Sequence, residues 1–185
     1  MKKLMILALA AVAFASVSEA STFKWKTKAG QAIYEAGSTT LKVDGATAYI
    51  FDAASVAQAA LVEAFAKGTL DLSSGSLDHL TVSSSGTISV GDAVTYGTAE
   101  SNYSMYFALI DDGKLYISDA QNYKAPAGAD ATTIQFSPKT SSQLAALDAT
   151  AGYKAAGWYT AVPEPTSGLL LLLGVAGLAL RRRRA

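Results

Sequence analysis

The sequence contains no cysteine, a single histidine and only four prolines among its 185 residues. Without cysteine the chain can form no disulfide, no thiolate nucleophile and no cysteine-ligated zinc site. One histidine cannot supply the several imidazoles of a histidine-based metal site. The sequence also shows no cluster of carboxylates with the spacing of metal ligands. We therefore expect no metal and no cofactor, and a fold that is stabilised by burial alone.

The lone histidine, His79, follows Asp78 and has Ser76 and Ser83 nearby, which are the residue types of a Ser/His/Asp site. The sequence has no Gly-x-Ser-x-Gly elbow, and adjacent residues of a strand point to opposite faces. We interpret His79 as a surface or loop histidine. The sequence predicts no catalytic residue, so we do not expect an enzyme.

The N-terminal end has the composition of an export signal. Lys2 and Lys3 are followed by an apolar run from Leu4 to Val17 and by the small-x-small tripeptide Ser18-Glu19-Ala20. This order is typical of a secretory signal peptide. We expect passage through the export translocon and cleavage by a signal peptidase after Ala20.

The C-terminal end carries three elements in succession. They are Pro163-Glu164-Pro165, an uncharged run from Gly168 to Leu180, and the basic cluster Arg181, Arg182, Arg183 and Arg184. The run gives about 20 Å of helix, short of the roughly 30 Å hydrocarbon core, but arginines at a helix end can snorkel to the cytoplasmic interface. We expect a hydrophobic helix that anchors the chain transiently in the inner membrane. The prolines favour an extended strip, the conformation in which proteases bind their substrates.

In order and spacing these elements resemble the PEP-CTERM sorting signal of Gram-negative bacteria. The resemblance implies recognition by an exosortase, a membrane cysteine protease or transpeptidase, near Pro163, Glu164 and Pro165. It also implies release of the upstream domain to the cell surface or extracellular matrix. Proteins with this signal occur in bacteria that make exopolysaccharide, which is an implied further partner. A permanent tail anchor or a coincidental apolar tail is the alternative.

The two terminal signals divide the chain into a signal peptide at 1–20, an exported passenger domain at 21–160 and a sorting signal at 161–185. When the terminal basic residues and Glu19 are left out, 9 basic and 14 acidic residues remain. This mildly acidic balance argues against nucleic acid as a partner.

Alternating apolar residues predict that the passenger domain is rich in strands. Phe23, Trp25 and Thr27 alternate with three lysines, which is typical of a half-buried strand. The strongest hairpin joins Tyr103–Ile110 to Lys114–Ser118 through Asp111-Asp112-Gly113, and Asp44-Gly45 predicts a second hairpin turn. Further strands are expected at Ala32–Glu35, Thr39–Val43, Ala46–Phe51, Leu80–Ser83, Thr87–Val90, Ala93–Tyr96, Thr132–Phe136 and Tyr153–Thr160.

Two helices are expected. The first is Ala53–Ala66, with Asp52 as N-cap and Gly68 just beyond its C-terminal end. The second is a short helix at Ser141–Asp148, capped by Ser141 or Ser142. The fold class is therefore α+β or mainly β, with an antiparallel sheet or sandwich and one or two covering helices.

These observations favour a non-enzymatic exported envelope or matrix protein. A carbohydrate-binding or adhesive module is the alternative, because flat rings stack on sugars, although most strand aromatics fill the core. The candidate rings are Trp25, Tyr96, Tyr103, Tyr106, Tyr116, Tyr123, Trp158 and Tyr159. A glycan-active enzyme is a second alternative and would need two carboxylates about 5 to 10 Å apart. Asp111, Asp112 and Asp119 could bind calcium, but the turn explains the first two.

Overall fold

The computed structural model describes residues 20–127, 130–138 and 145–161. Within these ranges the protein is mainly β, which is one of the two fold classes expected from the sequence; the other was α+β. Ten strands are present there: β1 (Ala20–Thr27), β2 (Thr47–Asp52), β3 (Asp78–Thr81), β4 (Val94–Thr98), β5 (Asn102–Asp111), β6 (Lys114–Ile117), β7 (Gln121–Lys124), β8 (Thr132–Phe136), β9 (Leu147–Asp148) and β10 (Gly157–Thr160). They are accompanied by helix α1 (Gln58–Ala66) and the 3-10 turn η2 (Ala149–Ala151).

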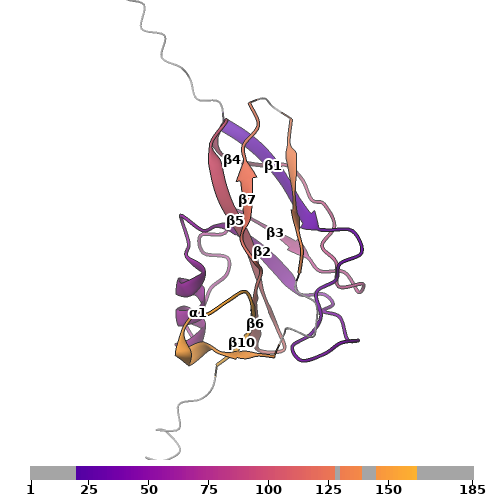
Figure 1. The fold of residues 1–185 in the computed structure, drawn as a ribbon, viewed down its shortest axis with the longest axis vertical. Coiled ribbons are helices and arrows are strands. Elements are labelled where there is room, and N and C mark those ends of the chain that lie inside the picture. The colour runs from indigo at the N-terminus through magenta and orange to yellow at the C-terminus, as the bar shows by residue number, and fades with distance from the viewer. Residues whose placement is uncertain (1–19, 128–129, 139–144, 162–185) are drawn as a thin grey trace, which may run out of the picture.

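The strands form two sheets, which Figure 1 shows as an elongated β structure with α1 on one side. The small sheet has the order β4-β1-β8, and the large sheet has the order β3-β2-β5-β6-β10-β9, with β7 also paired to β5. Each sheet contains one parallel pair, β1 with β8 and β10 with β9. The expectation of an antiparallel sheet is therefore wrong for these two pairs, because their members come from distant parts of the chain and run in the same direction.

The small sheet packs against one face of the large sheet, so the arrangement is a sandwich. Phe23, Trp25 and Phe136 of the small sheet are buried in one core with Phe107 of β5. The ring centroid of Phe107 lies 6.1 Å from that of Trp25 and 5.2 Å from that of Phe136. The Trp25 Nε1–H donates to Asp78 Oδ2 at 2.7 Å, which links β1 to β3 of the other sheet.

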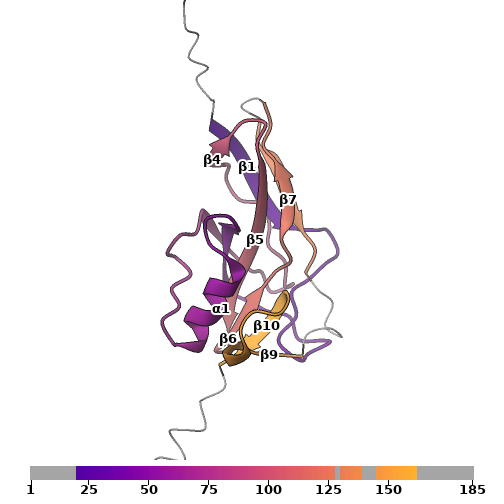
Figure 2. The same cartoon turned by 60° about the vertical axis from the view of Figure 1, so that its left-hand side comes forward.

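The opposite face of the large sheet is covered by α1, as Figure 2 shows beside β5 and β6. Leu61 and Val62 of the helix share a second core with Phe51, Tyr106 and Tyr159 of the sheet. The central strand β5 consequently has an unbroken run of buried residues from Met105 to Leu109. The molecule has three layers: small sheet, large sheet and helix.

Several sequence predictions are confirmed. The alternation in β1 is as expected, with Phe23, Trp25 and Thr27 buried. The β5–β6 hairpin closes at the pair Asp111–Lys114, and its two turn residues have φ angles of 46° at Asp112 and 66° at Gly113. Positive φ at both positions is the requirement of the hairpin turn that Asp-Gly favours. The strand over Thr132–Phe136 is also found as expected, as β8.

The first helix begins later than expected. Asp52 does not cap it, because Asp52 is the last residue of β2 and pairs with Met105 of β5. Its buried carboxylate accepts hydrogen bonds from the Ala54 amide at 3.2 Å and from the Tyr96 hydroxyl at 2.8 Å. Residues 53–57 therefore form a turn, and α1 starts at Gln58. Gly68 follows the helix with a φ of 68°, as the end signal predicted.

The two strands expected before Asp44 and the hairpin turn expected at Asp44-Gly45 are wrong. The segments 32–35 and 39–43 are joined by the isolated bridge Tyr34–Lys42 and form no regular strand, and Asp44-Gly45 is not a hairpin turn. After Gly45 the chain enters β2, which pairs with β3 and β5 rather than with the preceding segment. Ile50 and Phe51 of β2 pair instead with Phe107 and Tyr106 of β5, and all four large apolar side chains are buried.

Five other expectations need correction or concern residues outside the described ranges. Residues 87–90 contribute the single bridge Val82–Ile88, and the last strand starts at Gly157 rather than at Tyr153. Leu147–Asp148, expected at the end of a helix, is strand β9, and Ser141 and Ser142 lie outside the described residues. The signal peptide before Ala20 and the C-terminal hydrophobic helix lie outside them as well.

Candidate functional site

The two ends of the folded domain lie at opposite poles. Figures 1 and 2 both show β1 beginning at one end of the long axis and β10 ending at the other. Ala20, the predicted cleavage residue, is exposed and pairs with Thr98 of β4, whereas the next residue, Ser21, is buried. At the other pole, Trp158 and Tyr159 of β10 are buried between β6 and β9, and the strand ends at Thr160. The last described strand therefore ends at Thr160, directly before position 161.

Residues 161–184 match the PEP-CTERM protein-sorting motif. The resemblance seen in the sequence is thus confirmed, and the motif starts directly after β10. The chain is accordingly a protein sorted through its C-terminal end, which makes it an exported protein with an exosortase as a partner. The motif residues Pro163, Glu164, Pro165 and Arg181 to Arg184 lie outside the described part of the chain.

Other comparisons give the passenger domain no relative. No curated protein and no solved structure matches the chain. Among the residues that the structure describes, no helix has both the length and the apolar character needed to span a bilayer. The PEP-CTERM motif is therefore the part of this chain that resembles a known family. The passenger domain has to be interpreted from its own geometry.

The structure does not bring a Ser/His/Asp site together. Asp78 accepts the hydrogen bond of the Trp25 indole, whereas the exposed His79 packs its ring against Tyr49, with centroids 5.7 Å apart. The Ser76 hydroxyl donates to the Ser73 carbonyl, and Ser83 interacts with Thr87. The interpretation of His79 as a surface residue is confirmed.

The acidic residues at the β5–β6 turn serve the turn itself. Asp112 is exposed and lies 3.3 Å from the Lys114 ammonium. Burial and the neighbouring Asp112 carboxylate raise the pKa of Asp111. No group of three His, Cys, Asp or Glu side chains with the geometry of a metal site occurs in the described ranges.

Most of the predicted sugar-stacking rings are in the core. The buried ones are Trp25, Tyr106, Tyr116, Tyr123, Trp158 and Tyr159. The remaining pair, Tyr96 and Tyr103, is partly exposed, and the two rings contact each other with centroids 5.4 Å apart. Their hydroxyls are already engaged, that of Tyr96 with Asp52 and that of Tyr103 with the Thr98 amide. These eight residues therefore form no open aromatic platform.

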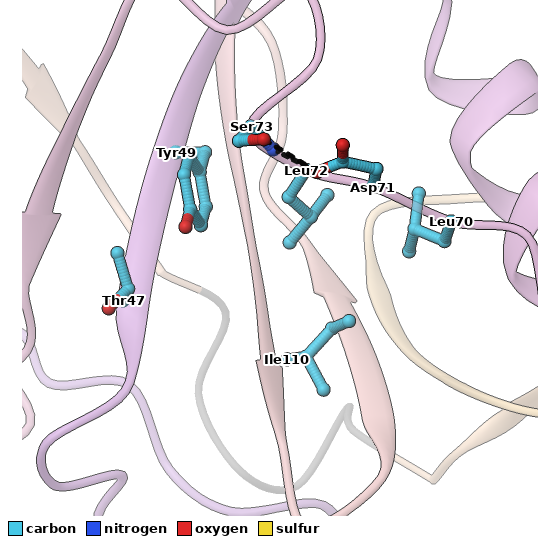
Figure 3. A pocket seen from close by; sticks show the side chains of 7 residues that line it. All are labelled: Thr47, Tyr49, Leu70, Asp71, Leu72, Ser73 and Ile110. Carbon is cyan, nitrogen blue, oxygen red and sulfur yellow. Dashed lines mark hydrogen bonds between the residues drawn. The ribbon is translucent and has the colours of Figure 1, made fainter.

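A surface hollow of about 370 Å³ was not foreseen from the sequence. Figure 3 shows Thr47 and Tyr49 on β2 facing the segment Leu70–Ser73, with Ile110 of β5 below them. Asp71 Oδ1 accepts from the Ser73 amide and hydroxyl, and these bonds lower the pKa of the Asp71 carboxyl. The lining contains one ring and one carboxylate, so it lacks the second carboxylate that glycoside hydrolysis requires.

Proposed function

We propose that this chain is a non-enzymatic protein of the cell envelope or extracellular matrix, which an exosortase separates from its C-terminal tail. The observation that carries the proposal is the PEP-CTERM motif at 161–184, positioned directly after the last strand. The signal-peptide pattern ending at Ala20 supports export of the domain that lies between the two.

The geometry of β10 supports a tail that can be removed. Gly157, Trp158 and Tyr159 pair with β6, and Thr160 pairs with Asp148 of β9. This pairing ends before the motif begins, and a cut near Pro163–Pro165 leaves the described pairing of β10 with β6 and β9 in place. The passenger domain would reach the cell surface or matrix with both of its cores intact.

The tail residues have distinct roles in this proposal. Pro163, Glu164 and Pro165 present an extended strip to the exosortase, because proline disfavours helix in its own position and in the preceding one. The apolar run then keeps the precursor in the inner membrane. Arg181 to Arg184 keep the end of the chain on the cytoplasmic side.

Replacement of Pro163, Glu164 and Pro165 by alanine in the full chain tests the proposal in the native host. We expect the variant to remain in the inner-membrane fraction with its tail attached, while the wild type loses Arg181–Arg184 and reaches the surface. Mass spectrometry of the recovered C-terminus and cell fractionation measure the two effects. A four-lysine replacement of the arginines is the matched control, because it keeps the charge and should be processed.

Two results would count against the proposal. One is a mature wild-type protein that still ends in the arginine cluster, which would leave a permanent membrane anchor. The other is surface display of the alanine variant at the wild-type level.

A further inference from the structure

The outward face of β1 carries a row of lysines. Lys24 and Lys26 alternate with the buried Phe23 and Trp25, and Lys28 follows directly after the strand. Residues two apart on a strand share a face and are separated by about 6.6 Å. Three of the lysines of the exported part, two on β1 and one directly after it, are thereby concentrated along roughly 13 Å of extended chain.

The neighbouring side chains on this face are uncharged and polar. Lys24 pairs with Thr133 of β8, and Lys26 pairs with Gln135. On the other side of β1, Thr95 of β4 is exposed and pairs with Thr22, which shares the face of Lys24. The sequences of the three strands, ASTFKWKT, VTYGT and TTIQF, contain no acidic residue.

The positive charge of this row is not neutralised by ion pairs within the described part of the chain. Ion pairs there involve Lys67, Lys114 and Lys124 instead. Because the exported part as a whole has an excess of acidic residues, the row is a local positive region on an acidic molecule. Such a region attracts polyanions over about a Debye length, roughly 10 Å at 0.1 M salt.

The side chains around the lysines indicate which class of polyanion this face would bind. Its outward residues include no aromatic ring on which a base could stack, since Tyr96 lies on the inner side of β4 with Val94. They also include no large apolar side chain that could enter a lipid layer. Ammonium, hydroxyl and amide groups in a row fit a linear chain that presents carboxylates and hydroxyls together.

We propose that this surface, the lysine face of Lys24, Lys26, Lys28, Thr95, Thr133 and Gln135, binds an acidic polysaccharide of the uronic-acid type. The lysines attract the carboxylates, and the threonine and glutamine side chains hydrogen-bond to sugar hydroxyls. The inference goes beyond the sorting function, because it rests on β1 and its neighbours and on no residue of the tail.

Binding of polygalacturonate by the purified full chain, in a mild detergent and at about 50 mM salt, tests the proposal. The variant K24Q/K26Q/K28Q should bind at least about tenfold more weakly than the wild type. The control K67Q/K114Q/K154Q removes the same charge elsewhere and should change the affinity by less than about threefold. The variant K24R/K26R/K28R retains the charge and should bind like the wild type. Circular dichroism of each variant confirms that it is folded.

Three results would overturn the proposal. Equal losses in the two glutamine variants would show that only net charge matters. Absence of wild-type binding would remove the site altogether. Equal or tighter binding of polyglutamate or of single-stranded polythymidylate would assign the face to another class of polyanion. None of these results depends on whether the tail is processed, so failure here is distinguishable from failure of the sorting proposal.

Discussion

The central strand of the large sheet and the central strand of the small sheet bury their residues in different ways. From Met105 to Leu109 every residue of β5 is buried, because one face meets the small sheet and the other meets α1. In β1 buried residues alternate with Lys24 and Lys26, because its outer face is open to solvent. The large sheet is therefore buried on both faces at β5, whereas the small sheet is buried on one face at β1.

The largest effect should come from the middle of β5. Phe107→Ala removes a ring that contacts Trp25, Tyr116 and Phe136, and we expect it to lower the free energy of unfolding by about 3–5 kcal/mol. Lys26→Ala on β1 is the control and should change it by less than about 0.5 kcal/mol. Urea unfolding followed by tryptophan fluorescence measures both. A loss below about 1 kcal/mol for Phe107→Ala would mean that β5 is not the stabilising centre.

The link between the sheets comes next. Asp78→Ala leaves the fully buried Trp25 indole N–H without its partner, and we expect a loss of about 1–3 kcal/mol in unfolding free energy. Asp71→Ala, an exposed aspartate bonded within its own turn, is the matched control and should cost less. In the background of Trp25→Phe the effect of Asp78→Ala should largely disappear. Additive losses would show that the two side chains do not interact.

The helix-covered face should make the protein sensitive to alkali. Burial raises the pKa of Tyr106 and that of Tyr153 above the ordinary value of 10.0, so the folded state favours the neutral phenols. Their contribution to stability is complete below about pH 10 and is lost as the pH rises through the folded-state pKa values. Urea midpoints at pH 9 and pH 11 should therefore differ, with the lower midpoint at pH 11. Tyr153→Phe should reduce the difference, and equal midpoints in the wild type would contradict the expectation.

The smallest effect on stability should come from the lysine face. The variant K24Q/K26Q/K28Q removes charges that make no ion pair in the described structure, so we expect its unfolding free energy to stay within about 0.5 kcal/mol of the wild type. Urea unfolding at low and high salt checks this. A loss of more than about 2 kcal/mol would mean that the outer face of β1 is part of the stabilising structure.

Features set by neighbouring residues could be predicted from the sequence. The alternation of β1, the Asp112-Gly113 turn and the end of α1 at Gly68 all follow from local side-chain and backbone preferences. The sorting motif was recognisable for a related reason, since its three parts are read in order along the chain. Each of these signals lies within a few residues of the feature that it predicts.

Features set by distant partners could not be predicted. Aspartate is a residue type that commonly caps helices, but the pairing of Asp52 with Met105 and its hydrogen bond from Tyr96 place it in a strand. The parallel partner of β1 and the hollow beside Tyr49 likewise depend on segments far away in the chain. Thr39–Val43 was predicted as a strand from its own residues, but the following segment pairs with β5, and 39–43 forms one bridge, at Lys42.

The position of β1 in the small sheet has a consequence for the order of folding during export. β1 is the first strand in the chain, and its parallel partner β8 follows six other strands and the helix. A chain that is exported from its N-terminal end would expose Phe23 and Trp25 before Ile134 and Phe136 arrive to cover them. Such non-local pairing slows folding and prolongs the vulnerable interval. The early strand therefore waits for its parallel partner during most of the passage of the domain.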